Sequence, residues 1–225
     1  MNAGQMTRAK FGTLVSLMPK TVIHLVRHGL VHNPNEVFYG RLPRFRLSEE
    51  GQRQAQAAAQ ALRTQPIAAA YSSPLLRTRQ TAQAILAHHP HINLKTTPLL
   101  LEVGTPWDGT PIPNLVARDW DIYTGNPLPH EQPEHIVARA RRFFDGVRAK
   151  HHGQHILAVS HGDVIAFTIL WAKGQPLDWR HKGENTRFGF ADAYPQTASI
   201  TMLTFDLADT SDPDARPEVS YLRPY

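Results

Sequence analysis

Apolar residues recur along this chain with two periods, one typical of buried strands and one typical of amphipathic helices. Four short apolar runs and one alternating run predict strands over residues 21–26, 68–71, 92–96, 156–159 and 199–205. Helical periodicity between these runs predicts helices that begin after Ser48 and Ser73, and further helices over residues 136–147 and 163–173. This alternation of strand and helix is typical of an α/β domain with a mainly parallel sheet.

The same pattern predicts how the sheet is covered and where the domain ends. Residues 156–159 are apolar without interruption, as expected of a strand buried on both faces, whereas residues 199–205 alternate and are predicted to form an antiparallel edge strand. We therefore expect a single three-layer domain over residues 18–207, with helices on both faces of the sheet. In this interpretation residues 1–17 are an N-terminal extension and residues 208–225 are a C-terminal tail.

Cap and turn residues refine the boundaries of these elements. Ser48 is a predicted N-cap, and Ser73 is predicted to cap the next helix with Pro74 at its first position. Residues 98–130 are rich in Pro, Gly and Trp and are expected to be irregular. An irregular segment of this length inside a compact domain usually has a functional role.

Composition narrows the class of protein. The chain has 225 residues and no cysteine, which removes disulfides, thiol nucleophiles and Cys-ligated zinc. No window reaches the ~18 apolar residues of a membrane-spanning helix, so we expect no membrane partner. The formal net charge of +5 comes from dispersed Lys and Arg residues, which favours an enzyme of small anionic molecules over a nucleic-acid binder. We expect a cytoplasmic location.

Two histidine–glycine pairs follow predicted strands. His28-Gly29 ends the first strand in HLVRHG, and His161-Gly162 ends the buried late strand in LAVSHG. A third pair, at residues 152–153, follows a helix and is interpreted as its glycine stop. Ligands of open α/β sheets bind beyond the carboxyl ends of the strands. The first two histidines are therefore candidates for catalysis.

Two arginines are predicted to lie at the same edge of the sheet. Arg77 falls in the first turn of the helix after the second strand, where unpaired N–H groups attract anions. Its planar guanidinium can hold two phosphate oxygens at once. Arg27 directly precedes His28. Together these residues indicate a site for a phosphate group.

These residues belong to a series of motifs in the order typical of one family. The motifs are Arg27-His28-Gly29, Gly40 with Leu47-Ser48 and Gly51, Ser72-Ser73-Pro74-Leu75 with Arg77 and Gln80-Thr81-Ala82, and Ser160-His161-Gly162. They resemble those of the histidine phosphatase (phosphoglycerate mutase-like) superfamily and cover residues 21–173. The resemblance implies that Arg27, His28, Arg77 and His161 form the phosphate pocket. It also implies that the reaction needs no metal and no other cofactor.

The expected chemistry agrees with this resemblance. Neutral His28 attacks phosphorus and forms a phosphohistidine, which water then hydrolyses. The arginines and His161 stabilise the charge on the transferring phosphoryl oxygens. Glu102 is the first candidate for the proton donor, since related enzymes carry an acidic residue in this segment and its apolar neighbours can raise the pKa of a carboxyl. Asp108 is the alternative.

Other positions depart from the family pattern and leave the substrate open. Asn33 lies one residue closer than the asparagine common in that loop, and we expect it to contact phosphate. Arg41, Arg44 and Arg46 occupy a loop where an acidic residue is frequent, and they either hold an anionic substrate or lie in solvent. The usual Gly-Glu-Ser before the third long helix is absent, and residues 130–132 read His-Glu-Gln near that place.

The sequence therefore predicts a metal-independent phosphatase of a small phosphorylated metabolite, with no nucleic-acid partner. A phosphoglycerate mutase, which is an isomerase that uses the same phosphohistidine, is one alternative. A binding protein that has lost turnover is another. The histidine clusters at residues 88–91 and 151–155 are interpreted as solvated surface residues rather than metal ligands.

Overall fold

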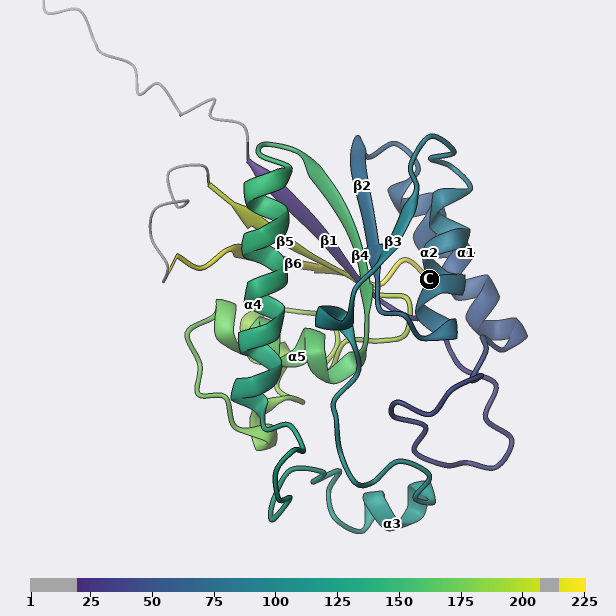
Figure 1. Cartoon of the computed structure of the whole chain (residues 1–225), viewed down its shortest axis with the longest axis vertical. Helices are drawn as coiled ribbons and strands as arrows, with labels where there is room; N and C mark the ends of the chain where they lie inside the picture. The colour runs from purple at the N-terminus through teal and green to yellow at the C-terminus, as the bar shows by residue number, and fades with distance from the viewer. Residues whose placement is uncertain (1–19, 207–214) are drawn as a thin grey trace, which may run out of the picture.

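Two neighbouring strands, β1 (Thr21–Arg27) and β4 (His155–Ser160), form the centre of the sheet. The computed structural model describes residues 20–206 and 215–225, and Figure 1 shows the arrangement of the elements. The two central strands pair in parallel up to Arg27 opposite Ser160, so both end at the same edge. The apolar run 156–159 is fully buried, as its composition predicted.

Within the described residues, six strands form one sheet in the order β3-β2-β4-β1-β5-β6. On one side of the centre, β2 (Ile67–Ser72) and β3 (Leu94–Thr96) are parallel to their neighbours. On the other side, β5 (Ile200–Phe205) and β6 (Glu218–Leu222) are antiparallel to theirs. The predicted α/β fold, with a mainly parallel sheet and an antiparallel edge, is confirmed.

The prediction that residues 199–205 form the edge strand is wrong. β6 pairs along the outer side of β5, with Ile200 opposite Leu222, and β6 is itself the edge. This strand lies within residues 208–225, for which the sequence predicts only a C-terminal tail. Its five residues are partly exposed and include Glu218 and Ser220, so the local pattern is too weak to indicate a strand. Pairing with β5 supplies the missing stabilisation.

Alternate residues of β1 face two separate apolar layers. Ile23 and Leu25 belong to the core beneath one pair of helices, and Val26 belongs to the core beneath the other pair. Figure 1 shows the two pairs on opposite faces of the sheet. The first pair is α4 (Pro133–Lys150) with α5 (Gly162–Ala172), and the second is α1 (Glu49–Leu62) with α2 (Leu76–Leu86). This is the expected three-layer arrangement.

No helix in the described ranges has both the length and the apolar character needed to cross a membrane.

The two predicted serine caps have different outcomes. Ser48 is the N-cap of α1, and its hydroxyl accepts a hydrogen bond from the Gly51 amide at 3.0 Å. The prediction for Ser73 is wrong, because α2 begins only at Leu76 and has no side-chain cap. The Ser73 amide instead donates to Val159 O at 3.0 Å, which keeps Ser73 in line with the sheet.

The segment 98–130 is more ordered than its composition predicted. It contains a 3₁₀ turn, η1 (Pro98–Leu100), and a short helix, α3 (Ile112–Val116). Prolines stand at the beginning of both elements, where the missing N–H costs no hydrogen bond. Two further 3₁₀ turns, η2 (Trp179–His181) and η3 (Asn185–Phe188), follow α5. These irregular segments gather around the carboxyl edge of the sheet.

Two glycines in helices allow a test of this packing. A Cβ on Gly51 of α1 would overlap the carbonyl oxygen of Leu30, whereas a Cβ on Gly146 of α4 would meet nothing within 4 Å. We expect Gly51→Ala to lower the free energy of unfolding by about 1–3 kcal/mol through overpacking, as measured by urea denaturation. Gly146→Ala is the matched control and should raise the free energy of unfolding by about 0.5–1 kcal/mol through its better helix propensity. Equal effects at the two sites would contradict this account.

Candidate active site

The ends of β1 and β4 bring the two candidate histidines together. The His28 amide donates to Ser160 O at 3.0 Å, and this bond continues the pairing of the strands by one residue. The rings of His28 and His161 lie edge to face with their centroids 5.2 Å apart. Both side chains are almost completely buried. The prediction that these two histidines meet at one edge is confirmed by the geometry.

A hydrogen bond to the backbone fixes the tautomer of His28. Its Nδ1 lies 2.8 Å from the carbonyl oxygen of Gly29, which can only accept, so Nδ1 carries the proton. Burial, followed by the nearby charges of Arg77 and Arg27, holds the pKa of His28 well below its ordinary value. The imidazole is therefore neutral at neutral pH, with its lone pair on Nε2. This is the protonation state that a nucleophile needs.

Arg77 reaches this site from the first turn of α2. Only 1% of its surface is exposed, and it donates to Gly40 O at 2.6 Å. It also lies over the ring of Tyr39, 4.8 Å from the centroid. The Nε atom of Arg77 is buried and has no hydrogen-bond partner among the described residues. It can therefore donate to an anion.

Arg27 approaches from β1 and is held in a similar way. One guanidinium nitrogen donates to Pro195 O at 2.6 Å, and the group lies over the ring of Tyr194, 5.2 Å from the centroid. Its Nε is likewise buried without a partner in the described ranges. The two arginines thus place two fixed positive charges beside His28.

His161 is fixed by Arg77. The guanidinium donates to Nδ1 of His161 at 3.2 Å, which leaves the proton of the neutral ring on Nε2. Burial, and then the charge of Arg77, holds the pKa of His161 well below its ordinary value. Nε2 is buried with no partner among the described residues, and so this N–H is available to an oxygen of a bound group.

Glu102 lies just after η1, and its Oε2 is 3.6 Å from Nδ1 of His161. Burial, and then the negative charge of Asp163, raises the pKa of the Glu102 carboxyl, although Arg77 opposes the shift. The backbone is held in place by Arg41, which donates to Glu102 O at 2.7 Å. A carboxyl with a raised pKa beside the two histidines can hold a proton and release it.

Two other predicted residues are bonded to loop backbone rather than to the histidines. The amide group of Asn33 is bonded to the backbone of Val37, through Nδ2 to O at 2.8 Å and through Oδ1 to N at 3.3 Å, so it closes a loop. Asp108 accepts from the Arg41 amide at 3.0 Å and lies behind Gly40, whose φ is +31°. Neither residue lines the cavity. Arg77 and His161 do not line it either, but both contact residues that do, since Arg77 is bonded to Gly40 and the ring of His161 lies against that of His28.

Arg41 does not offer a free charge to a substrate. Its guanidinium is bonded to Oε2 of Glu131 at 2.7 Å, and Glu131 is also bonded to Arg139 of α4 at 2.7 Å. Glu131 stands in the His-Glu-Gln triplet that replaces the usual Gly-Glu-Ser. This cluster ties the loop after β1 to α4 and supports the backbone of Glu102.

A buried cluster around Asp163 was not predicted from the sequence. Its carboxylate accepts from Tyr123 and from Lys182 on one oxygen, and from Tyr194 on the other at 2.6 Å. Burial alone would raise the pKa of Asp163, but Lys182 and the two hydroxyls outweigh it and the pKa is lowered. The only local signal is that Asp163 is an acidic residue in the first turn of α5. Tyr194 and Lys182 come from distant irregular segments.

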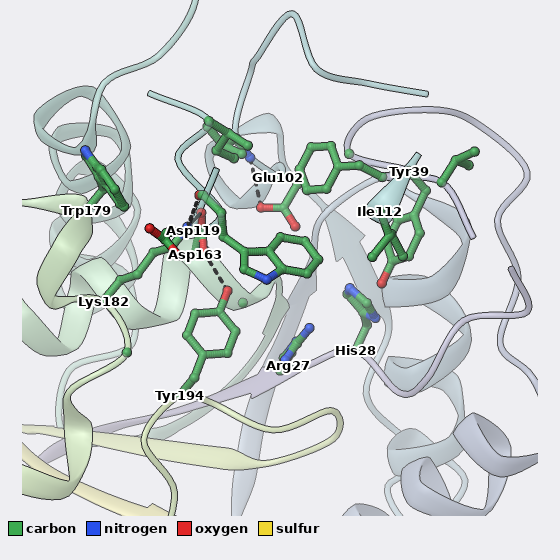
Figure 2. A pocket seen from close by; sticks show the side chains of 18 of the residues that line it. Arg27, His28, Tyr39, Glu102, Ile112, Asp119, Asp163, Trp179, Lys182 and Tyr194 are labelled. Carbon is green, nitrogen blue, oxygen red and sulfur yellow. Dashed lines mark hydrogen bonds and ion pairs between the residues drawn. The ribbon is translucent and has the colours of Figure 1, made fainter. Parts of the chain in front are cut away.

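Of the groups described above, Arg27, His28, Glu102, Asp163, Lys182 and Tyr194 line a cavity of about 820 Å³. Figure 2 shows Arg27, His28 and Glu102 around it, with Trp179 and Lys182 on the side opposite Tyr39 and Ile112. Its lining residues come from the end of β1 and the loop after it, from the segment before α4, and from the start of α5 and the segment after it. They are Arg27, His28, Val37, Phe38, Tyr39, Gly40, Glu102, Val103, Ile112, Asp119, Trp120, Ile122, Gly162, Asp163, Trp179, Arg180, Lys182, Gly183 and Tyr194.

The same residues could in principle hold a metal ion. His28, Glu102 and His161 each offer a ligand atom, and these atoms lie within 4.8 Å of one another. The guanidinium groups of Arg27 and Arg77 beside them repel a cation and attract an anion. The charge of the site therefore fits a phosphate group better than a metal.

The histidine cluster at residues 88–91 differs in part from its prediction. His89 is not solvated but buried, with Nε2 3.2 Å from Leu62 O. In the cluster at residues 151–155, His155 is half-buried, and its Nδ1 lies 3.1 Å from Nε2 of His24 in β1. Both histidines pack within the fold, and neither lines the cavity.

Comparison with known proteins identifies the family of the chain. The sequence model of the histidine phosphatase superfamily (branch 1) matches residues 23–205. An uncharacterised protein of Mycobacterium tuberculosis is 39% identical over 170 residues, which cover 71% of this chain and 83% of that protein. The chain belongs to the histidine phosphatase superfamily.

Solved structures with the same fold include both a phosphatase and a mutase. A mycobacterial glucosyl-3-phosphoglycerate phosphatase has a TM-score of 0.72 at 22% identity, covering 91% of this chain and 99% of that one. A phosphoglycerate mutase from Bacillus anthracis has a TM-score of 0.67 at 19% identity, covering 91% and 93%. At these identities the likeness shows the fold alone.

The buried carboxyl of Glu102 should make stability depend on pH. Because its pKa is raised from the ordinary value of 4.5, the folded chain retains a proton that the unfolded chain has released. Stability contributed by this group is therefore lost as the pH rises from about 4.5 through the folded-state pKa. Glu102→Gln lacks this loss, so its free energy of unfolding relative to the wild type should rise between about pH 4 and about pH 8 in urea denaturation.

The control for this prediction is Glu134→Gln, at an exposed position in the first turn of α4. Its relative free energy of unfolding should show no rise over the same range. A Glu102→Gln curve parallel to that of the wild type would contradict a raised pKa.

Proposed function

We propose that this protein hydrolyses a phosphate monoester through a phosphohistidine on His28. The observation that carries the proposal is the state of His28, a neutral imidazole whose Nδ1 is fixed by Gly29 and which lies close to the charges of two arginines. A nucleophile of fixed tautomer beside fixed positive charges suits attack on a phosphate dianion.

The first step transfers the phosphoryl group. Nε2 of His28 attacks phosphorus, the bond from phosphorus to the leaving oxygen breaks, and Glu102 gives its proton to that oxygen. The raised pKa of Glu102 supports this role, since the carboxyl must hold a proton before the step. The products are an alcohol, a phosphohistidine and an ionised Glu102.

The second step releases phosphate. Water attacks the phosphohistidine, Glu102 takes a proton from that water, and the bond between nitrogen and phosphorus breaks. His28 and protonated Glu102 are then restored. Arg27, Arg77 and the Nε2–H of His161 stabilise the oxygens of the transferring group in both steps, which is where most of the catalysis of phosphoryl transfer arises.

In this proposal the protein turns its substrate over and does not only bind it. The residues to which we assign these roles support it, since His28, Arg27 and Glu102 line one cavity and Arg77 is bonded to His161 beside them. A mycobacterial phosphatase with the same fold supports phosphatase chemistry, although a mutase also has this fold. The reaction proposed here uses no metal ion.

The nucleophile can be tested by substitution and by trapping. His28→Ala should lower phosphatase activity on an aryl phosphate to background, because no other group can accept the phosphoryl. Rapid denaturation of the wild type during turnover of a ³²P-labelled substrate, with EDTA present throughout, should yield an acid-labile phosphoenzyme. The label should be absent from His28→Ala. Label on serine or aspartate, or a need for metal, would overturn the mechanism.

Hydrolysis and isomerisation can be separated in a coupled assay. Given 3-phosphoglycerate and the bisphosphate that primes a mutase, net release of phosphate should outpace formation of 2-phosphoglycerate. A mutase must keep water from the phosphohistidine, whereas the cavity of about 820 Å³ leaves room for water. Arg41 is also bonded to Glu131 and is not available to hold the carboxylate of phosphoglycerate. If 2-phosphoglycerate forms faster than phosphate is released, the protein is a mutase and the proposed hydrolase activity is wrong.

A further inference from the structure

Beyond the phosphate pocket, the cavity has a wall that is mainly apolar and aromatic. One side consists of Phe38, Ile112 and Ile122, and Trp120 and Trp179 also line the cavity. Trp120 is 40% exposed, so part of its apolar surface at the cavity is not covered by the protein itself. A wall of this kind suits a ligand with an apolar or aromatic body.

Backbone hydrogen bonds hold the first side of this wall in place. The Phe38 amide donates to Thr110 O at 2.7 Å, and the Ile112 amide donates to Glu36 O at 2.8 Å. The loop after β1 and the segment before α4 are therefore bonded to each other along the cavity. The wall exists before any ligand binds.

Trp120 is held by a different device. Asp119 and Trp120 have φ angles of +51° and +58°, a conformation that side chains other than glycine rarely adopt. The Nζ of Lys182 donates to Trp120 O at 3.3 Å and to Asp163 at 3.0 Å, so it links this strained turn to α5. Strain kept in place by specific contacts is characteristic of functional segments.

The positive charges of the wall are already paired. Besides Arg27, the cations that line the cavity in the described part of the chain are Arg180 and Lys182. Arg180 is bonded to Asp178 at 2.7 Å, and Lys182 is bonded to Asp163. The carboxylate of Asp119 is exposed and adds a negative charge to the wall. A second anionic group on a ligand would have to compete with these carboxylates for a cation, and it would be repelled by Asp119.

From these observations we propose that the wall is a binding site for the leaving group, and that the substrate is a phosphate monoester of a neutral aromatic or apolar alcohol. Trp120 and Trp179 contact the body of the alcohol, and Asp119 discriminates against carboxylated or doubly phosphorylated molecules. This inference rests on the proposed function, because that function sets the orientation of the substrate, with its phosphate group at Arg27 and His28.

Phosphonates test the site without turnover, because their carbon–phosphorus bond is not hydrolysed. Binding of methylphosphonate, benzylphosphonate and 4-carboxybenzylphosphonate is measured by calorimetry on the whole chain. Benzylphosphonate should bind about 10-fold tighter than methylphosphonate through its buried ring. It should also bind about 10-fold tighter than the carboxylated analogue. Equal or tighter binding of the carboxylated analogue would overturn the proposal.

Substitutions assign the preference to residues. Trp120→Ala and Trp179→Ala should each weaken benzylphosphonate about 5- to 10-fold and leave methylphosphonate unchanged. Val116→Ala is the matched control, since Val116 is exposed on α3 and does not line the cavity. Asp119→Asn keeps a residue that tolerates positive φ and should tighten only the carboxylated analogue, by about 3-fold or more. An unchanged ratio between the two aromatic ligands in Asp119→Asn would remove Asp119 from the proposal.

The outcomes separate this proposal from the proposed function. If the chain releases phosphate from phenyl phosphate through His28 but the tryptophan variants lose no selectivity, the leaving-group site is wrong and the hydrolase remains. If benzylphosphonate shows the predicted pattern and no aryl phosphate is turned over, the binding site remains and the hydrolase falls. If no phosphonate binds but phenyl phosphate is turned over, only the leaving-group site is wrong, and if neither is observed, both are wrong.

Discussion

The parallel pairing of β1 with β4 is the constraint on which the rest of the structure depends. Arg27 lies opposite Ser160, so the next residue of each chain segment is a histidine at the same edge. A slip of two residues along the pairing would move the rings apart by about two strand rises, roughly 6–7 Å. Backbone hydrogen bonds at both ends of the pairing hold this register, since the Val22 amide donates to Gln154 O and the His28 amide donates to Ser160 O, each at 3.0 Å.

The charges of the site follow from this arrangement. Two arginines lie beside His28. Burial, together with the positive charge of these guanidinium groups, disfavours protonation of His28 and His161 and keeps both rings neutral. The carboxyl of Glu102 has the opposite shift, because burial and Asp163 disfavour its ionised form. Burial thus favours the uncharged form of His28, His161 and Glu102, to which we assign the transfer steps, while the arginines remain charged. A phosphate dianion would complete the balance of charge.

Local sequence could predict the parts of the site that lie on regular elements. His28 and His161 directly follow strands, and Arg77 lies in the first turn of a helix, so periodicity alone places all three at one edge. Glu102 follows a short apolar stretch after β3, and the resemblance to a family was needed to single it out. Asn33 and Arg41 carry suitable groups, but their partners, Val37 and Glu131, are set by the packing of loops that no periodic pattern describes.

The cluster around Asp163 could not be predicted from local sequence either. Tyr123, Lys182 and Tyr194 are far apart in sequence and meet only because three irregular segments fold over the start of α5. β6 is a comparable case in the sheet, since its five residues become a strand only beside β5. In each case the information lies in long-range contacts rather than in the local pattern.

The separation between strand-borne and loop-borne residues has an evolutionary consequence. The groups that would handle phosphate lie at the ends of β1 and β4 and at the start of α2, whereas the tryptophans and Asp119 lie in irregular segments. Loops accept substitutions and insertions with little effect on the core beneath them. Mutations that reshape the wall can therefore accumulate without disturbing His28 and its neighbours, so descendants of one ancestor can diverge in the ligands they accept while the strand-borne site stays the same.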